Sequence, residues 1–280
     1  TPAPALSAIP IGSRAPAAMP SRVMSALLMA AAAVVAAPAR AATAPASPSS
    51  GDIFLTYGTG PFTRQTARLA GEARATGAFG KVVAADGAMI DPTYASAHAS
   101  ILDAPRGGGY WLWKPYLVAK LLHEAADGDV VMYVDAGSKL VGDPRPLLNL
   151  ARKHGFLGFR MGHQSKAWTK GDVYEALNMD LATYGAERQL SGAVLLFKKC
   201  PRTVDLVQRW LALCERPELI TDAPSRAPND PAFQDHRHDQ SILTLLLLKH
   251  GVPLVLEDQT HPKEVAKAVF VARLRDGMME

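Results

Sequence analysis

One short segment of the chain combines aromatic side chains with a cationic one. Residues 110–115 read Tyr-Trp-Leu-Trp-Lys-Pro, with two indoles and an ammonium group. Indoles suit sugar rings and nucleobases, and a lysine suits phosphate. The alternation predicts both indoles on one side of an extended segment. Together the indoles and the lysine suggest an enzyme that takes a sugar from a sugar nucleotide, the donor, to an acceptor. We assign Trp111 to the sugar or acceptor, and Trp113 and Lys114 to the donor. The alternative is that the indoles are core residues and that the lysine lies on the surface.

A second segment, residues 129–137, is an apolar run that ends in Asp135 and Gly137. A carboxylate at the carboxyl end of a buried strand is how open α/β sheets build ligand sites. Such a group can hold Mn²⁺ or Mg²⁺, which would neutralise a leaving diphosphate. We therefore predict donor binding by both residues, with Asp135 as the metal ligand. The alternative is a tight turn in which the aspartate accepts backbone hydrogen bonds.

The densest polar cluster, residues 236–241, reads His-Arg-His-Asp-Gln-Ser and precedes a very apolar run. It predicts the start of a helix, whose positive dipole end suits an anionic ligand. His238 and Asp239 are the candidate catalytic residues, and Gln240 is a candidate sugar ligand. The alternative is a helix capped by Asp239 with solvated neighbours.

Further candidates come from the ends of two other predicted strands. Gln189, Ser191 and Gly192 precede a strong strand and could contact sugar hydroxyls. Thr56 and Tyr57 end the first strand, where open α/β sheets often meet the nucleotide. Ordinary turns are the alternative for both groups. A lone histidine, His261, could complete a metal shell.

Strands and helices alternate along the chain, which predicts an α/β protein with a mainly parallel sheet and helices on both faces. No G-x-G-x-x-G or G-x-x-x-x-G-K-[ST] follows the first strand, which disfavours nicotinamide and P-loop enzymes. The predicted strands are 52–57, 81–85, 130–134, 156–159, 192–198 and 253–256, and the predicted helices are 62–75, 92–102, 116–126, 145–154, 204–213 and 241–250.

The first 51 residues differ in composition from the rest. They contain no acidic residue and three arginines, with an apolar stretch at 23–39. A small-x-small pattern follows at 39–41, so we expect a cleaved signal peptide, with a membrane anchor and an organelle transit peptide as alternatives. We predict two parts: this leader with its Pro/Ser/Ala linker, and one catalytic domain at 52–280.

The charge of the chain argues against a nucleic-acid-binding protein, and the spacing of its two cysteines argues against a disulfide. Three of the 30 basic residues lie in the leader, so residues 52–280 carry 27 basic and 26 acidic residues. The catalytic part is close to neutral, and no basic block with aromatics suggests nucleic acid. Cys200 and Cys214 would lie about 20 Å apart along the predicted helix, too far for a disulfide.

Four motifs in order resemble those of GT-A-fold glycosyltransferases, a family of nucleotide-diphospho-sugar transferases. They are residues 109–115, 131–137, 189–197 and 236–241. The resemblance implies a single-domain GT-A fold: a Rossmann-like, mixed but mainly parallel sheet flanked by helices. It implies transfer of a sugar, hexosyltransferase-like, from a nucleoside diphosphate to the hydroxyl of a carbohydrate or glycoconjugate. Asp135 matches the first position of the family's D-x-D-like motif, and Gly137 stands where a second aspartate is common, so metal dependence is open.

The resemblance also implies a role for Asp239, and two alternative functions stay open. An inverting enzyme needs a base, for which Asp239 is the candidate, and a retaining enzyme would use it for orientation. The rivals are a non-catalytic domain that binds carbohydrate or nucleotide sugar, and a secreted metal-dependent hydrolase with His236, His238 and Asp239 as ligands. The leader and the activity together suggest the secretory pathway, in the Golgi lumen or membrane; a membrane-anchored periplasmic protein or an organelle protein is the alternative.

Overall fold

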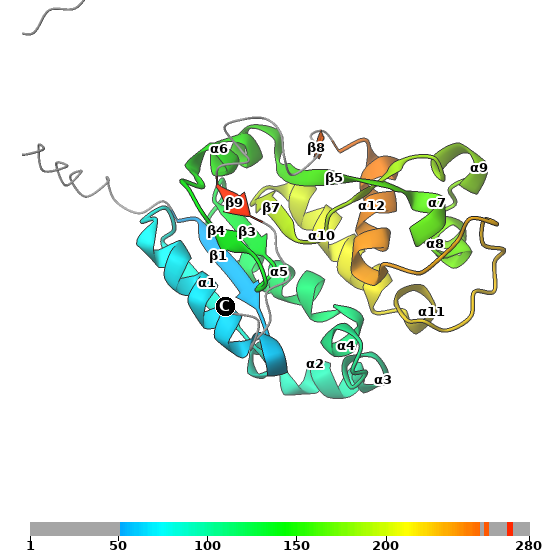
Figure 1. Cartoon of the computed structure of the whole chain (residues 1–280), viewed down its shortest axis with the longest axis horizontal. Coiled ribbons are helices and arrows are strands. Elements are labelled where there is room, and N and C mark those ends of the chain that lie inside the picture. Colours follow the sequence, from blue (N-terminus) through cyan, green and yellow to red (C-terminus); the bar gives the residue numbers. More distant parts are fainter. Residues whose placement is uncertain (1–50, 253–254, 258–267, 271–280) are drawn as a thin grey trace, which may run out of the picture. The chain divides into compact units, whose positions relative to one another are not determined.

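A seven-stranded mixed sheet forms the centre of the computed structural model, which describes residues 51–252, 255–257 and 268–270 (Figure 1). Six strands follow the order β2-β1-β3-β7-β5-β6, and a seventh, β8, pairs with β5. The strands are β1 (Ile53–Tyr57), β2 (Lys81–Ala85), β3 (Val130–Val134), β5 (Phe156–Gln164), β6 (Arg188–Leu190), β7 (Val194–Lys198) and β8 (Val255–Glu257).

One half of the sheet is parallel. β1 pairs in parallel with β2 on one side and with β3 on the other. The chain therefore leaves β1 towards one edge and returns to the opposite side, which makes the space between β1 and β3 a topological switch point. In open α/β sheets, ligands bind outside the carboxyl ends of the strands at such a point. Tyr57 ends β1 there, and Asp135 follows β3 directly.

The other half is mostly antiparallel. β7 runs antiparallel to both β3 and β5, and β6 runs antiparallel to β5. Of the six pairings, β1·β2, β1·β3 and β5·β8 are parallel. The predicted α/β class and mixed sheet flanked by helices are confirmed. The parallel share is smaller than expected, because β7 lies between β3 and β5 and reverses the strand direction there.

Helices cover both faces of the sheet, and successive residues of the strands serve opposite cores. Leu55 belongs to the core formed with α5 (Trp113–Glu124), α10 (Pro201–Cys214) and α12 (His238–His250). Phe54 belongs to the core formed with α1 (Thr63–Ala75) and α6 (Arg145–His154). Both side chains are fully buried. The described residues belong to one compact unit.

The short elements complete the fold. They are η1 (Gly60–Phe62), η2 (Gly87–Met89), α2 (Pro92–Ala97), α3 (Ala99–Leu102), α4 (Gly107–Tyr110), β4 (Lys139–Leu140), α7 (Ser165–Trp168), α8 (Gly171–Ala176), α9 (Leu181–Tyr184), α11 (Pro217–Ile220) and β9 (Val269–Phe270). The strand at 81–85 and the helix at 145–154 match their predicted bounds. The helix predicted at 92–102 divides at His98, and β5 continues five residues past its predicted end.

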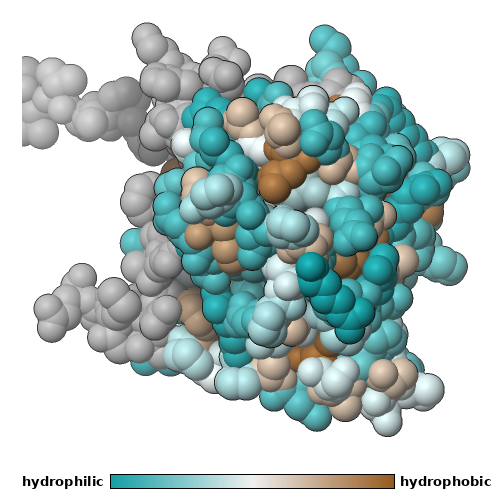
Figure 2. Space-filling model, turned by 90° about the vertical axis from the view of Figure 1, so that its right-hand side faces the viewer, coloured by the Kyte–Doolittle hydropathy of each residue, from teal (hydrophilic) through white to brown (hydrophobic). Residues whose placement is uncertain are grey.

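The side of the molecule that carries α7, α8 and α9 is mainly hydrophilic, with isolated apolar patches between polar residues (Figure 2). Among the described residues, no helix is long and apolar enough to cross a membrane. The predicted leader and His261 lie outside the described residues. Both cysteines are free thiols, as predicted, and burial raises the pKa of Cys214.

Candidate active site

Lys114 stands at the centre of a cluster built from four separate segments. Its side chain lies in the first turn of α5 and is only 3% exposed. The ammonium donates a hydrogen bond to the carbonyl of Gly192 at 3.1 Å. It also lies 3.2 Å from Oδ2 of Asp239 and 3.8 Å from Oδ1 of Asp135. We call these four residues the lysine cluster. A buried lysine requires such partners, because an unpaired ammonium is costly to bury.

The turn after β3 sets the position of Asp135. Its backbone N–H donates to the carbonyl of Ala193 at 2.8 Å, which ties the turn to the residue before β7. On the far side, Arg68 of α1 donates to the carbonyls of Ala136 at 3.0 Å and Ser138 at 2.6 Å. Gly137 is buried within this turn. Asp135 is therefore held by a fixed backbone, although its side chain reaches solvent.

Tyr133 belongs to the site, although the sequence analysis did not select it. Its hydroxyl donates to Oδ1 of Asp135 at 2.5 Å, and its ring lies 4.9 Å from the ammonium of Lys114. Burial and then the Asp135 charge raise the pKa of Tyr133 well above its ordinary value, so the phenol stays protonated. The available signal was its spacing: residues two apart on a strand lie on the same face.

The two carboxylates of the cluster differ in exposure. The side chain of Asp135 is 43% exposed and that of Asp239 is 4% exposed. Burial raises the pKa of Asp239 to about 6, although Lys114 lowers it. Oδ2 of Asp239 accepts no hydrogen bond from the described residues. Asp239, the predicted base, thus joins the cluster as a buried counter-ion, and Asp135 is the carboxylate that faces solvent.

Amide side chains extend the cluster towards β5 and β6. Gln240 accepts from the N–H of Gly192 at 3.0 Å and donates to the Oε1 of Gln189 at 3.2 Å. Gln189 is buried and donates to the hydroxyl of Thr169 at 2.7 Å. Ser191 is also buried, and its hydroxyl accepts from the N–H of Ala193 at 3.3 Å. The predicted sugar ligands are therefore brought together, but mainly as a buried network behind Gln240.

The expected extended segment with both indoles on one side was wrong. Trp113 begins a helix, and Trp111 has a φ of +61°. The two rings consequently separate. Trp113 is 4% exposed and stacks on Tyr57 at 3.8 Å, and its N–H donates to the carbonyl of Gly107 at 2.9 Å. This stack forms an aromatic wall under the carboxyl end of β1.

Trp111 lies in a left-handed turn. Residues 107–111 all have positive φ values, which L residues other than glycine rarely adopt. Tyr110 and Trp111 are the non-glycine members, and their rings lie 5.1 and 5.2 Å from the ring of His238, which itself has a φ of +50°. Strained residues that contact one another often mark a functional site, because the surrounding structure must hold them in place.

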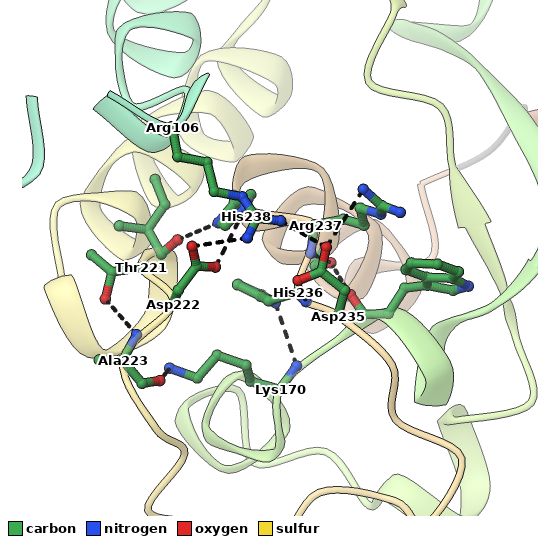
Figure 3. Close-up of polar contacts among 12 residues, drawn as sticks. Arg106, Lys170, Thr221, Asp222, Ala223, Asp235, His236, Arg237 and His238 are labelled. Carbon is green, nitrogen blue, oxygen red and sulfur yellow. Dashed lines mark hydrogen bonds and ion pairs between the residues drawn. The ribbon is translucent and has the colours of Figure 1, made fainter. Parts of the chain in front are cut away.

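A second polar cluster surrounds the start of α12 (Figure 3). Arg106 bridges Asp222 at 2.9 Å and Asp235 at 2.7 Å. Nδ1 of His238 lies 2.7 Å from the carbonyl of Ile220, and Nε2 of His236 lies 2.8 Å from the carbonyl of Leu219.

Each of these two nitrogens therefore carries a proton, since a carbonyl only accepts. Burial lowers the pKa of both His236 and His238, so the imidazoles are neutral.

The described residues contain no group of three or more histidine, cysteine or acidic side chains placed to hold a divalent metal by themselves. Asp135 is a single carboxylate with one oxygen bound by Tyr133 and a fixed ammonium 3.8 Å away. Asp143 is paired with Arg145 at 3.1 Å. The His236, His238 and Asp239 set expected for a hydrolase is not among such groups, and the carboxylate of Asp239 pairs with Lys114 at 3.2 Å.

Thr56, a predicted donor ligand, points away from the aromatic wall. Thr56 lies on the same face of β1 as Phe54, because alternate strand residues share a face, whereas Tyr57 lies on the opposite face with Trp113. The hydroxyl of Thr56 is buried and has no hydrogen-bond partner among the described residues.

No protein-family model matches the sequence, and no curated protein matches it either. Among the solved structures with a distant likeness are the following three.

A glycosyltransferase involved in glycosylation of the major capsid of PBCV-1 is 12% identical, with a TM-score of 0.43 over 79% of this chain and 93% of that one. Mouse xyloside xylosyltransferase 1 is 13% identical, with a TM-score of 0.43 over 75% and 85%. The galactosyltransferase LgtC is 16% identical, with a TM-score of 0.40 over 74% and 73%. At these values the likeness says nothing about what this chain binds.

Proposed function

We propose that this chain is a glycosyltransferase that moves a sugar from a nucleoside-diphosphate donor to a hydroxyl of a carbohydrate or glycoconjugate acceptor. The observation that supports it is the convergence on Lys114 of Asp135 after β3, Gly192 before β7 and Asp239 in α12. These groups meet beside the switch point between β1 and β3, where open α/β sheets bind nucleotides. The parallel strands β2-β1-β3 would be the Rossmann-like half that the motif resemblance implies.

In this proposal the donor binds at the carboxyl ends of β1 and β3. The stacked rings of Tyr57 and Trp113 form the wall there, and Asp135 is the exposed polar group. The ammonium of Lys114 is buried among protein partners, so in this proposal it offsets the negative charge that develops on the leaving diphosphate through space rather than by direct contact. The buried carboxylate of Asp239 holds this ammonium in position. Gln240 and Trp111 would contact the acceptor side.

The carboxylate available to an acceptor hydroxyl is Asp135, because the carboxylate of Asp239 is buried against Lys114. A base must reach the proton that it removes, by a direct hydrogen bond or through one water. In this proposal Asp135 meets that condition in the ligand-free geometry. Asp239 could act only after the lysine cluster rearranges.

The second candidate is a domain that binds a nucleotide sugar or a carbohydrate without transferring it. Gly137 in place of a second carboxylate favours it, because the turn then offers only Asp135 to a metal ion. Donor turnover separates the two candidates. The secretory location, membrane association through the leader, and use of Mn²⁺ or Mg²⁺ are also proposals, based on the sequence and the motif resemblance.

The test is donor binding and turnover by the full chain with a panel of UDP-, GDP- and CMP-sugars, with and without manganese. We expect one nucleotide to raise the melting temperature and its sugar to be released or transferred. Asp135→Asn should lower turnover by a factor of at least 100. The matched control is Asp143→Asn, an aspartate paired with Arg145 outside the lysine cluster, which should leave turnover unchanged.

Binding of a donor without turnover under any condition would favour the non-catalytic candidate. No response to any nucleotide would refute the transferase and a domain that binds nucleotide sugars, and would leave only a domain that binds carbohydrate. A requirement for manganese would mean that the ion is coordinated by Asp135 as the single carboxylate ligand and by the phosphates of the donor.

A further inference from the structure

A strip of surface side chains continues from Gln240 away from the lysine cluster. The Nε2 of Gln240 lies 3.7 Å from the sulfur of Met161 on β5. His163 lies two residues further along the same strand, where the pairing of β5 with β6 is irregular between Arg160 and Gln164. Its ring lies 5.3 Å from that of Trp168, and Trp168 lies under Arg237. We call Met161, His163, Trp168 and Arg237 the acceptor strip.

Arg237 is the residue of this strip with hydrogen-bonding capacity to spare. Its guanidinium lies 4.2 Å from the centre of the Trp168 ring, and its side chain is 40% exposed. The ion-pair partner nearest to it is Asp235 at 3.7 Å, and that carboxylate is held at 2.7 Å by Arg106. Among the described residues, the Arg237 side chain donates no hydrogen bond that would occupy its five N–H groups.

The backbone fixes the strip next to the candidate active site. The carbonyl of Trp168 accepts from the N–H of Arg237 at 3.1 Å and from the hydroxyl of Ser241 at 2.6 Å. Arg237 also precedes the first turn of α12, which carries Asp239 and Gln240. A ligand on the strip would therefore lie beside the first turn of α12, next to Asp239 and Gln240.

We propose that the acceptor strip binds an acidic sugar of the acceptor, with its anionic group on Arg237 and its ring against the part of Trp168 that the guanidinium leaves exposed. An aromatic face suits the apolar face of a sugar ring, and a guanidinium binds a carboxylate or phosphate through two parallel hydrogen bonds. His163 and Gln240 offer further polar contacts to hydroxyls. This inference rests on the proposed function, because it names the acceptor class of the same site.

The test measures binding to the full chain by NMR saturation transfer and titration, with four probes: glucuronate, glucose 6-phosphate, glucose and inorganic phosphate. We expect glucuronate or glucose 6-phosphate to bind at least tenfold more tightly than glucose, and the tighter of the two identifies the carboxylate or the phosphate form. Arg237→Gln should weaken that probe at least tenfold, and Trp168→Leu should weaken both the acidic probe and glucose.

The matched control is Arg74→Gln, an exposed arginine in α1, which packs on the other face of the sheet from α12. It should leave all four probes unchanged. Equal binding of glucuronate, glucose 6-phosphate and glucose to the wild type would overturn the proposal. So would an acidic probe that binds Arg237→Gln as tightly as the wild type, or inorganic phosphate that binds as tightly as glucose 6-phosphate.

UDP binding to the same samples separates this proposal from the proposed function. If UDP and the other nucleotides fail to bind while glucuronate binds as expected, the transferase proposal fails and the strip remains a site for acidic sugars. If a nucleotide binds and turns over while the acidic probes behave like glucose, the strip proposal alone fails. Melting temperatures within a few degrees of the wild type confirm that the variants are folded.

Discussion

The ammonium of Lys114 lies within 4 Å of two carboxylates that differ in their surroundings. Asp239 is buried, which raises its pKa to about 6, and Asp135 is partly exposed. When Asp239 is ionised, the three charged groups carry one net negative charge, and protonation of Asp239 makes them neutral together. The proton on Asp239 therefore affects both the stability of the fold and the binding of an anionic ligand.

The first prediction at this scale concerns stability. The pKa of Asp239 is raised to about 6 in the folded chain, so the folded state binds this proton more tightly than the unfolded chain does. The stability from this group is present below the unfolded pKa and is lost as pH rises through 6. Relative to Asp239→Asn, the unfolding free energy of the wild type should fall by about 2 to 3 kcal/mol between pH 4 and pH 7.5.

Urea unfolding of both proteins at the two pH values measures that change. The side chain of the asparagine variant does not titrate, so the pH dependence that remains in the variant comes from other groups and can be subtracted. A difference between the two proteins that does not vary with pH would contradict the prediction.

The second prediction concerns anion binding at the same residue. A nucleoside diphosphate beside the lysine cluster should bind more tightly when Asp239 is protonated, because the cluster then carries no net negative charge. UDP should therefore bind several-fold more tightly at pH 5.5 than at pH 8, beyond the change shown by Asp239→Asn. Calorimetric titrations of the two proteins at both pH values test this, and the variant corrects for titration of UDP itself. Parallel pH profiles would exclude a role for the Asp239 proton.

At the scale of elements, the left-handed turn at residues 107–111 decides where the aromatic rings go. Three glycines allow the chain to enter this turn with little strain, and Tyr110 and Trp111 continue it at a cost of about 1 to 2 kcal/mol each. The turn directs Trp111 to His238, while Trp113 in the helix that follows stacks on Tyr57. The geometry of this turn therefore fixes the positions of both Trp111 and Trp113, the residues that we propose for the acceptor side and the donor side.

Two neighbouring glycines of this turn provide a matched test. A Cβ on Gly108 would have no atom nearer than 3.8 Å, whereas a Cβ on Gly109 would lie 2.6 Å from the Cα of Leu102. Both glycines have positive φ, so both substitutions to alanine cost about 1 kcal/mol in backbone strain. Gly109→Ala should cost about 1 to 3 kcal/mol more because of the overlap. Chemical unfolding measures both, and equal losses would show that the backbone shifts freely.

The sequence predicted the regular elements well, because they carry their own periodicity. The apolar run at 130–134 and the amphipathic segment at 145–154 need no distant partner to be recognised. The left-handed turn could not be predicted, because a run of glycines allows many conformations and only the packing of Trp111 and His238 selects this one. The burial of Asp239 was missed for a similar reason: its partner, Lys114, lies 125 positions earlier in the sequence.

At the scale of the whole molecule, the sheet is shared by two cores. The core on the Leu55 face includes Trp113 and Trp210, and Trp111 packs against it. The core on the Phe54 face contains no tryptophan among the described residues. Tryptophan fluorescence therefore reports mainly on one face, whereas circular dichroism reports on the helices and strands of both.

Because the tryptophans lie on one core only, two optical probes can show whether the two cores unfold together. Phe54→Ala should cost about 3 to 5 kcal/mol and Leu55→Ala about 2 to 5 kcal/mol, because both side chains are fully buried. Since the same strand carries both residues, loss of one core removes the support of the other, and each variant should unfold in one transition. Fluorescence and circular dichroism should then give the same midpoint, including in Phe54→Ala. Two midpoints in that variant, with the dichroism change first, would mean that the α1 and α6 face unfolds independently of the face that carries the lysine cluster.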